Sequence, residues 1–242
     1  NLSGLTILNE QYGLVTGDGI RRIDLKSLNN VRIKNERLLC FYNSIIYNGK
    51  VLSNDTYKDE SKVKYYDVNE LIAAKEGEAP AVTELDIIQK QKINFVLAKD
   101  GNVYTLESAD NGCNIVKIKN DFTLEKVFAN FQPAKGPYHS SPTIGMVASE
   151  TENIIYLVST DGAIFKYILG DSDSLKAPFI AAESGVSITA PLQLNQQSGE
   201  LYVTYTEERK DESKIVVYSK DGKVLHTVDC GESVPSQILF NN

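Results

Sequence analysis

The chain has 242 residues, 42% of them apolar and 24% charged, with a net charge of −7 and a pI near 5.0. This composition is ordinary for a globular protein, and its scattered basic residues argue against a nucleic-acid partner. No apolar run approaches the roughly 20 residues needed to cross a bilayer, so we expect no transmembrane segment. The length fits one large all-β domain or two small ones.

Short strand-like runs follow one another along the first half of the chain, separated by turns rich in Gly, Asn and Asp. One helical turn is predicted over residues 69–74. The strands are predicted over residues 5–9, 20–25, 31–34, 38–47, 50–53, 62–68 and 82–85.

The second half continues in the same way, interrupted by a proline-rich loop over residues 132–142. Its strands are predicted over residues 93–98, 103–106, 113–118, 126–131, 143–148, 154–159, 164–169, 179–182, 187–194, 200–205, 214–219 and 224–228. A last strand, residues 234–242, has no obvious neighbour in sequence. Helical periodicity is nearly absent, which indicates an all-β fold.

The runs form a repeat, seen most clearly over residues 199–231, where a polar tip and an Asp221-Gly222 turn separate three strands. Aliphatic-Tyr pairs mark the second strand of three units, Val103-Tyr104, Ile155-Tyr156 and Leu201-Tyr202. Successive units begin about 43 to 52 residues apart, which is typical of a four-stranded propeller blade with a long loop.

We therefore predict a single β-propeller domain over residues 1–242, built of four-stranded antiparallel blades. Five blades fit best, with the C-terminal strand paired innermost with the N-terminal strands to close the ring. Six blades are the alternative if residues 5–9 and 13–15 form separate strands. A pair of β-sandwiches is the third choice, but it does not explain the regular spacing.

Several segments resemble the bacterial surface-layer-type (YVTN-like) β-propellers. The closing segment SKIVVYSKDGKVLHTVDCGESVPSQILF is similar to the end of those chains, LTILNE to their opening, and SIIYNGKVLSN with KVKYYDV to their second blade. Gln11-Tyr12 stands where the family pattern has glycine. The resemblance is nearest to extracytoplasmic propeller proteins of gut bacteria, many of them lipoproteins, and it implies a fold and a compartment but no activity.

Compartment follows from that resemblance. We expect a periplasmic or cell-surface protein, as an outer-membrane lipoprotein whose targeting segment has been removed, because the chain begins at Asn1 without a signal peptide. Cys40, Cys113 and Cys230 form neither a disulfide framework nor a zinc pair, and their redox state stays open.

Candidate ligand-binding residues lie where inner strands begin. Tyr138, His139 and Ser140 belong to the loop GPYHSSP, and hydroxyls, imidazole and a ring suit stacking and hydrogen bonding to a ligand. The weaker candidates are Glu10, Asn43, Asn94 and Thr189. The alternative for each is a purely structural role.

No catalytic residue, metal site or cofactor is assigned. A Ser-His hydrolase needs an activated nucleophile and an orienting carboxylate, and the chain has no GxSxG motif. Asp171 and Asp173 lack the glycine and distal Glu of a calcium-binding loop, which favours a solvated tip.

Three functions compete. The first is a non-catalytic, monomeric binding or scaffold propeller that engages protein or glycan through loops on one face. The second is a metal-dependent hydrolase or lyase with a site on the channel axis. The third is a structural domain of a larger surface protein.

Overall fold

The computed structural model describes residues 4–17, 19–34, 44–54, 61–89, 94–110, 112–132, 145–207, 212–235, 238 and 240. The chain divides into two compact units. Unit 1 comprises Asn1–Phe95 together with Leu106–Ser108 and Asn120–Thr123. Unit 2 comprises Val96–Thr105, Ala109–Lys119 and Leu124–Asn242.

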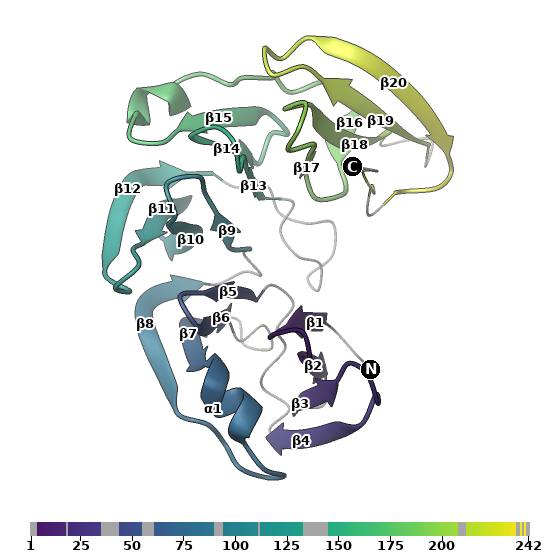
Figure 1. Cartoon of the computed structure of the whole chain (residues 1–242). Coiled ribbons are helices and arrows are strands. Elements are labelled where there is room, and N and C mark those ends of the chain that lie inside the picture. The colour runs from purple at the N-terminus through teal and green to yellow at the C-terminus, as the bar shows by residue number, and fades with distance from the viewer. Residues whose placement is uncertain are drawn as a thin grey trace. The chain divides into compact units, whose positions relative to one another are not determined.

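Two four-stranded antiparallel sheets make up most of unit 1 (Figure 1). The first pairs in chain order the strands β1 Gly4–Ile7, β2 Tyr12–Gly17, β3 Gly19–Asp24 and β4 Asn30–Lys34. The second pairs β5 Ile45–Tyr47, β6 Lys50–Asn54, β7 Ser61–Asp67 and β8 Val82–Gln89. This confirms the all-β class and the antiparallel four-stranded unit.

Helix α1, Val68–Ala73, lies between β7 and β8 and confirms the predicted helical turn. Asp67 caps its start, because its carboxylate accepts hydrogen bonds from the backbone N–H groups of Asn69 and Glu70. At the other end Arg22 donates to the carbonyl of Ala74 at 3.1 Å, which satisfies a group that a helix end leaves unpaired. Among the described residues, no helix is long and apolar enough to span a bilayer.

The core of unit 1 joins the two sheets to α1. The alternating apolar residues of the strands meet there, as the sequence pattern predicts. Its buried members are Leu8, Leu14, Ile20, Ile33, Val51, Tyr66, Val68, Leu71 and Ala74. On the opposite face of the first sheet, Leu5 and Ile7 are 59% and 52% exposed.

Unit 2 contains three sheets whose innermost strands lie side by side, since β13 contacts both β9 and β17 (Figure 1). The third sheet of the chain pairs β9 Val96–Leu97, β10 Val103–Ala109, β11 Gly112–Ile118 and β12 Leu124–Phe131. The fourth pairs β13 Met146–Ala148, β14 Ile154–Val158 and β15 Ile164–Ile168. The fifth contains β16 Val186–Ile188, β17 Gln193–Leu194, β18 Leu201–Glu207, β19 Ser213–Tyr218 and β20 Val224–Gly231.

The fourth sheet corrects one prediction, because residues 179–182 are not a strand. After β15 the chain forms the 3-10 helix Ser172–Leu175, and only two isolated bridges, Ile168 to Asp171 and Ile164 to Ile180, pair with that edge. Pro178 lacks the N–H that a continuous ladder would need. The fourth sheet therefore has three regular strands.

The fifth sheet corrects a second prediction. The strand predicted over residues 187–194 is broken into β16 and β17, both paired with β18. Pro191 lies in the gap and cannot donate to a ladder. Apolar side chains of the fourth and fifth sheets share one core, including Tyr156, Leu201, Val203 and Tyr218.

The two chain ends bear on the predicted closure of the ring. The first sheet contains four described strands from the N-terminal part of the chain, with residues 5–7 and 13–15 in separate strands. Of the predicted terminal strand, none of the described residues 234, 235, 238 and 240 belongs to a strand. The described residues form five sheets, and closure of a ring by the terminal strand stays a prediction.

Candidate functional site

Each sheet has two unlike ends. Because strands pair antiparallel in chain order, the turns from first to second and from third to fourth strand lie at one end, here called the turn end. Second-to-third turns and the connections to the next sheet lie at the other, here called the connection end. A propeller presents its loops at such ends, so each is a candidate for binding.

The short turns at the turn ends are capped by their own side chains, whereas the third-to-fourth connection of the second sheet contains α1. The Asn9 side chain accepts hydrogen bonds from the backbone N–H groups of Gln11 and Tyr12 at 2.9 and 2.7 Å. Asn195 caps the turn from β17 to β18 in the same way. Such Asx turns fix the backbone locally and leave little of it for a ligand.

Buried polar side chains gather instead at the connection ends. Those within the described residues are Ser53, Asn54, Gln89, Asn114, Ser159 and Ser213. Two further buried polar residues, Thr105 and Thr204, lie in mid-strand, and Ser149 lies at a turn end. Buried polar groups are costly unless they are hydrogen-bonded, so this asymmetry marks the connection ends as specialised.

In unit 1 these groups form a chain of amides. Asn54 Nδ2, at the end of β6, donates to Gln89 Oε1 at 2.6 Å, and Gln89 Nε2 donates to the carbonyl of Leu106 at 3.0 Å. Asn54 and Gln89 are 2% and 1% exposed. These hydrogen bonds fix the ends of β6 and β8.

In unit 2, Thr189 lies in the gap between β16 and β17. Its N–H donates to the carbonyl of Thr204 at 3.2 Å, and its hydroxyl is hydrogen-bonded to that of Thr206 at 2.8 Å. Asp161, in the turn after β14, accepts from the Ser159 hydroxyl and from the N–H of Ala163, and these bonds lower the pKa of its carboxyl.

The predicted ligand-binding residues divide between the two ends. Asn94 lies just before β9, at a connection end, whereas Thr189 lies opposite Thr204 in the gap between β16 and β17, with its hydroxyl directed to Thr206 nearer the connection end. Glu10 lies exposed in the turn after β1, at a turn end, because β1 is itself the innermost strand of its sheet. Asn43, Tyr138, His139 and Ser140 fall outside the described residues.

Acid–base chemistry has no evident centre among the described residues. Burial, followed by the hydrogen bond to Asp100, raises the pKa of Tyr104, and burial raises the pKa of Tyr156 to about 12. These hydroxyls stay protonated at neutral pH. Desolvation raises the pKa of Asp100, but hydrogen bonds from Lys117, Asn102 and Tyr104 outweigh it and lower the pKa overall. The network therefore stabilises the turn from β9 to β10.

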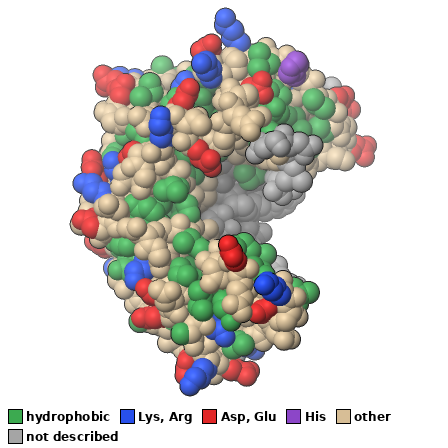
Figure 2. All heavy atoms as spheres, viewed as in Figure 1, with side chains coloured by type: hydrophobic (Ala, Val, Ile, Leu, Met, Phe, Trp, Pro, Cys, Tyr) green, Lys and Arg blue, Asp and Glu red, His purple; other side chains and the backbone are tan. Residues whose placement is uncertain are grey.

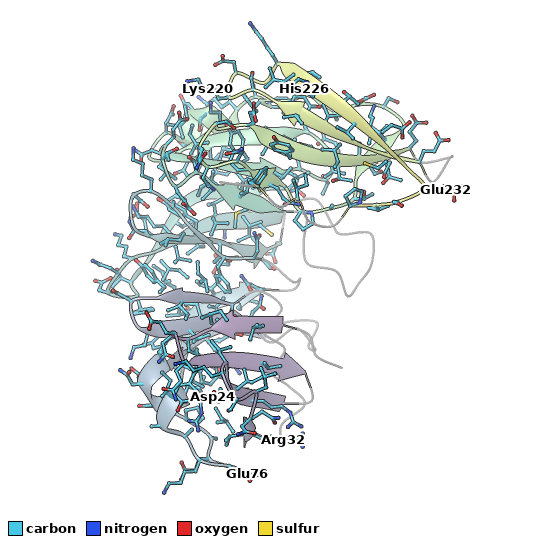
Figure 3. The ribbon with its side chains drawn as sticks, turned by 45° about the vertical axis from the view of Figure 1, so that its right-hand side comes forward. Asp24, Arg32, Glu76, Lys220, His226 and Glu232 are labelled. Carbon is cyan, nitrogen blue, oxygen red and sulfur yellow. The ribbon has the colours of Figure 1, made fainter. Side chains whose placement is uncertain are left out.

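Metal ligands are also not clustered in the described part of the chain. No three His, Cys, Asp or Glu side chains of that part come close enough to hold a metal ion. His226 projects into solvent from β20 (Figure 3), and Cys230 is a free thiol. Acidic and basic side chains are interspersed over the visible surface (Figure 2).

The family model described as a domain of unknown function, DUF5074, matches residues 4–241. The chain belongs to the DUF5074 family. No curated protein sequence matches it.

Solved structures similar to this DUF5074 chain share its fold at low identity. TolB from Acinetobacter baumannii has 9% identity and a TM-score of 0.58, over 96% of this chain and 55% of TolB. A puromycin hydrolase has 13% identity and a TM-score of 0.63, over 98% of this chain and 38% of the hydrolase. A catalytically inactive virginiamycin B lyase from Staphylococcus aureus has 14% identity and a TM-score of 0.51, over 99% of this chain and 74% of the lyase.

The similarity supports a β-propeller fold for this DUF5074 chain and carries no activity over to it. The chain spans only 55% and 38% of the first two of these proteins. Sequence reasoning missed the amide pair Asn54 and Gln89. Gln89 ends the apolar strand VTELDIIQ, and a carboxamide at that position was the available signal.

Proposed function

We propose that this DUF5074 chain is a non-catalytic binding or scaffold propeller that engages a protein or a glycan through the connection ends of its sheets. The observation that supports it best is the concentration of buried, hydrogen-bonded polar side chains at those ends, exemplified by Asn54 and Gln89. Rigid bases beneath polar loops are the arrangement that binding surfaces need.

The finer architecture belongs to the same proposal. The five sheets are five blades of one domain over residues 1–242, and their connection ends form one face. The chain acts as a monomer outside the cytoplasm, in the periplasm or at the cell surface, as the resemblance to surface-layer-type propellers implies.

A panel of glycans tests the function by thermal unfolding, with pull-down of extracytoplasmic proteins run in parallel. A ligand present at 100 times its Kd stabilises the folded state by about 2.7 kcal/mol. For a chain of this size that corresponds to a rise in Tm of about 5–10 °C.

Variants locate the site. Asn94→Ala and Thr189→Ala are expected to reduce the shift, whereas Glu10→Ala, at a turn end, leaves it unchanged. The placement at the connection ends would be wrong if Glu10→Ala alone removed the shift. A selective shift with calcium or zinc would instead favour the metal-dependent enzyme, and failure of every glycan and every pull-down would favour a structural domain of a larger protein.

A further inference from the structure

The fifth sheet has one face in the core of unit 2 and a second face that another part of the chain covers. Leu201, Val203 and Tyr205 point into the core. The strand register places Tyr202, Thr204 and Thr206 on the opposite face, next to Val217, Ile215 and Ser213 of β19. Thr204, Ser213 and Val217 are only 2%, 3% and 4% exposed, so this second face is covered.

The cover is the C-terminal strap, defined here as the described residues 232–235, 238 and 240. Ser213 donates from its hydroxyl to the carbonyl of Ser233, and Thr204 Oγ1 donates to the carbonyl of Pro235 at 3.5 Å. The N–H of Ile238 donates to Gln193 Oε1 at 2.7 Å. The ring of Phe240 meets that of Tyr202 edge-on, with centroids 5.0 Å apart.

The strap is bound in the way that a peptide ligand would be, mainly through its backbone. Each of the three hydrogen bonds joins a side chain of the sheet to a backbone atom of the strap, so none of them depends on the strap's own side chains. Among the described strap residues, Phe240 adds a side-chain contact, that of its ring with Tyr202 of the sheet. Backbone bonds supply affinity for any extended segment, and the aromatic contact supplies selectivity.

The strap is also held more weakly than its neighbours. No described strap residue belongs to a strand, and Glu232, Ser233 and Val234 are exposed, whereas β20 next to it is paired along its length with β19 (Figure 3). Segments with few buried contacts open locally at a lower free energy than the whole fold. On opening, the hydroxyls of Thr204 and Ser213 would be hydrated, which limits the cost.

The composition of the strap matches the surface beneath it. Residues 233–242, SVPSQILFNN, contain no charged side chain, although 24% of the whole chain is charged. The surface beneath continues to Val228 on β20, which the register places beside Ile215 and which is 52% exposed. An uncharged segment with an aromatic residue matches this surface.

We propose that this face of the fifth sheet is a peptide-binding surface, occupied in cis by the C-terminal strap and open to an extended, uncharged segment of a partner protein that carries an aromatic residue. The surface lies on the face of the fifth sheet and shares Ser213 with that sheet's connection end, whereas the proposed function rests on Asn54 and Gln89 of unit 1. Its failure would therefore leave the proposed function untouched.

The test uses a fluorescent peptide of residues 233–242 and the full chain carrying Phe240→Ala. The variant's own strap is weakened, whereas the wild-type strap competes at a millimolar effective concentration. We expect the peptide to bind the variant about tenfold or more tightly than the wild type. Phe128→Ala, a partly buried phenylalanine on β12, is the matched control and should bind like the wild type.

Two altered peptides test the recognition itself. Replacing Val234 and Ile238 by alanine should preserve binding to the variant, because the bonds run to the backbone, whereas Phe240→Ala in the peptide should abolish it. Adding Gln193→Ala to the Phe240→Ala chain should weaken binding several-fold. Absence of binding to a cooperatively folded Phe240→Ala chain would overturn the proposal.

Hydrogen exchange on the wild-type chain gives an independent reading that needs no variant. The amide of Ile238 should exchange much faster than that of Val216 in the ladder between β18 and β19. Equal protection of the two amides would mean that the strap opens only when the protein unfolds, and would contradict the proposal.

Discussion

Two turns of the molecule join the third and fourth strands of their sheets, and each contacts an aromatic ring that comes from a different side. Asn120–Thr123 joins β11 to β12, and residues 220–223 join β19 to β20. Both have an Asp followed by a residue in the left-handed region, Phe122 at φ 64° and Gly222 at φ 79°. In both, the first carbonyl accepts a hydrogen bond from the preceding sheet: from Asn48 Nδ2 at 2.6 Å, and from Lys166 Nζ at 3.1 Å.

The difference lies in which side supplies the aromatic ring. Phe122 packs its own ring against Tyr65 and Tyr47 of the second sheet, with centroids 4.6 and 5.9 Å away. At the other turn, Phe179 comes from the segment after the fourth sheet and lies over Gly222. A left-handed phenylalanine costs about 1–2 kcal/mol, so its ring contacts must offset that strain. At position 222 glycine is needed, because the ring of Phe179 occupies the space where a Cβ would lie.

The largest effect is expected from a substitution in the turn that contains glycine. In Gly222→Ala the new Cβ would lie 3.2 Å from Phe179 Cζ and 3.3 Å from its carbonyl oxygen, in a backbone conformation unfavourable for alanine. We expect a loss of about 2–3 kcal/mol in the free energy of unfolding. Urea unfolding measures it, and a loss below about 0.5 kcal/mol would contradict this account of the turn.

A pair of variants separates strain from packing at the other turn. Phe122→Ala keeps the strained backbone and loses a partly buried ring, which should cost about 2 kcal/mol. Phe122→Gly loses the same ring but relieves about 1 kcal/mol of strain, so it should be the more stable of the two. Equal unfolding midpoints for the two variants would mean that the left-handed conformation carries no strain here.

The smallest effect concerns the corresponding turn of the first sheet, which is closed by its own carboxylate. Hydrogen bonds from the backbone of Ser27 and the side chain of Gln11 hold the pKa of Asp24 at about 2, below its ordinary 3.8. The stabilisation is complete above the unfolded pKa and is lost as the pH falls from about 4 through 2. Asp24→Asn should therefore make stability fall less steeply over this range, as measured by urea unfolding at several pH values. An unchanged slope would show that these bonds do not favour the ionised form.

Local pattern predicted much of this architecture. Alternating apolar residues and Asp-Gly or Asn-Gly turns predicted the bounds of most strands to within a few residues. The helical turn was also predicted, and Asp67 caps its start. The breaks at Pro178 and Pro191 were misjudged, since a short apolar run resembles a strand whether or not a partner can bond to it. Of the candidate site, the sequence indicated Asn94 and Thr189, but the pairing of Asn54 with Gln89 joins residues 35 positions apart.

The sequence by itself determined the all-β class, the repeating antiparallel unit and the positions of its turns, because these depend on side-chain alternation and on local backbone preferences. Tertiary structure alone decided that four N-terminal strands pair in the first sheet, that Phe122 occupies a place suited to glycine, and that the C-terminal strap lies across the fifth sheet. Those outcomes depend on which distant side chains meet, and the free energy of such contacts is not encoded in any short stretch of the chain.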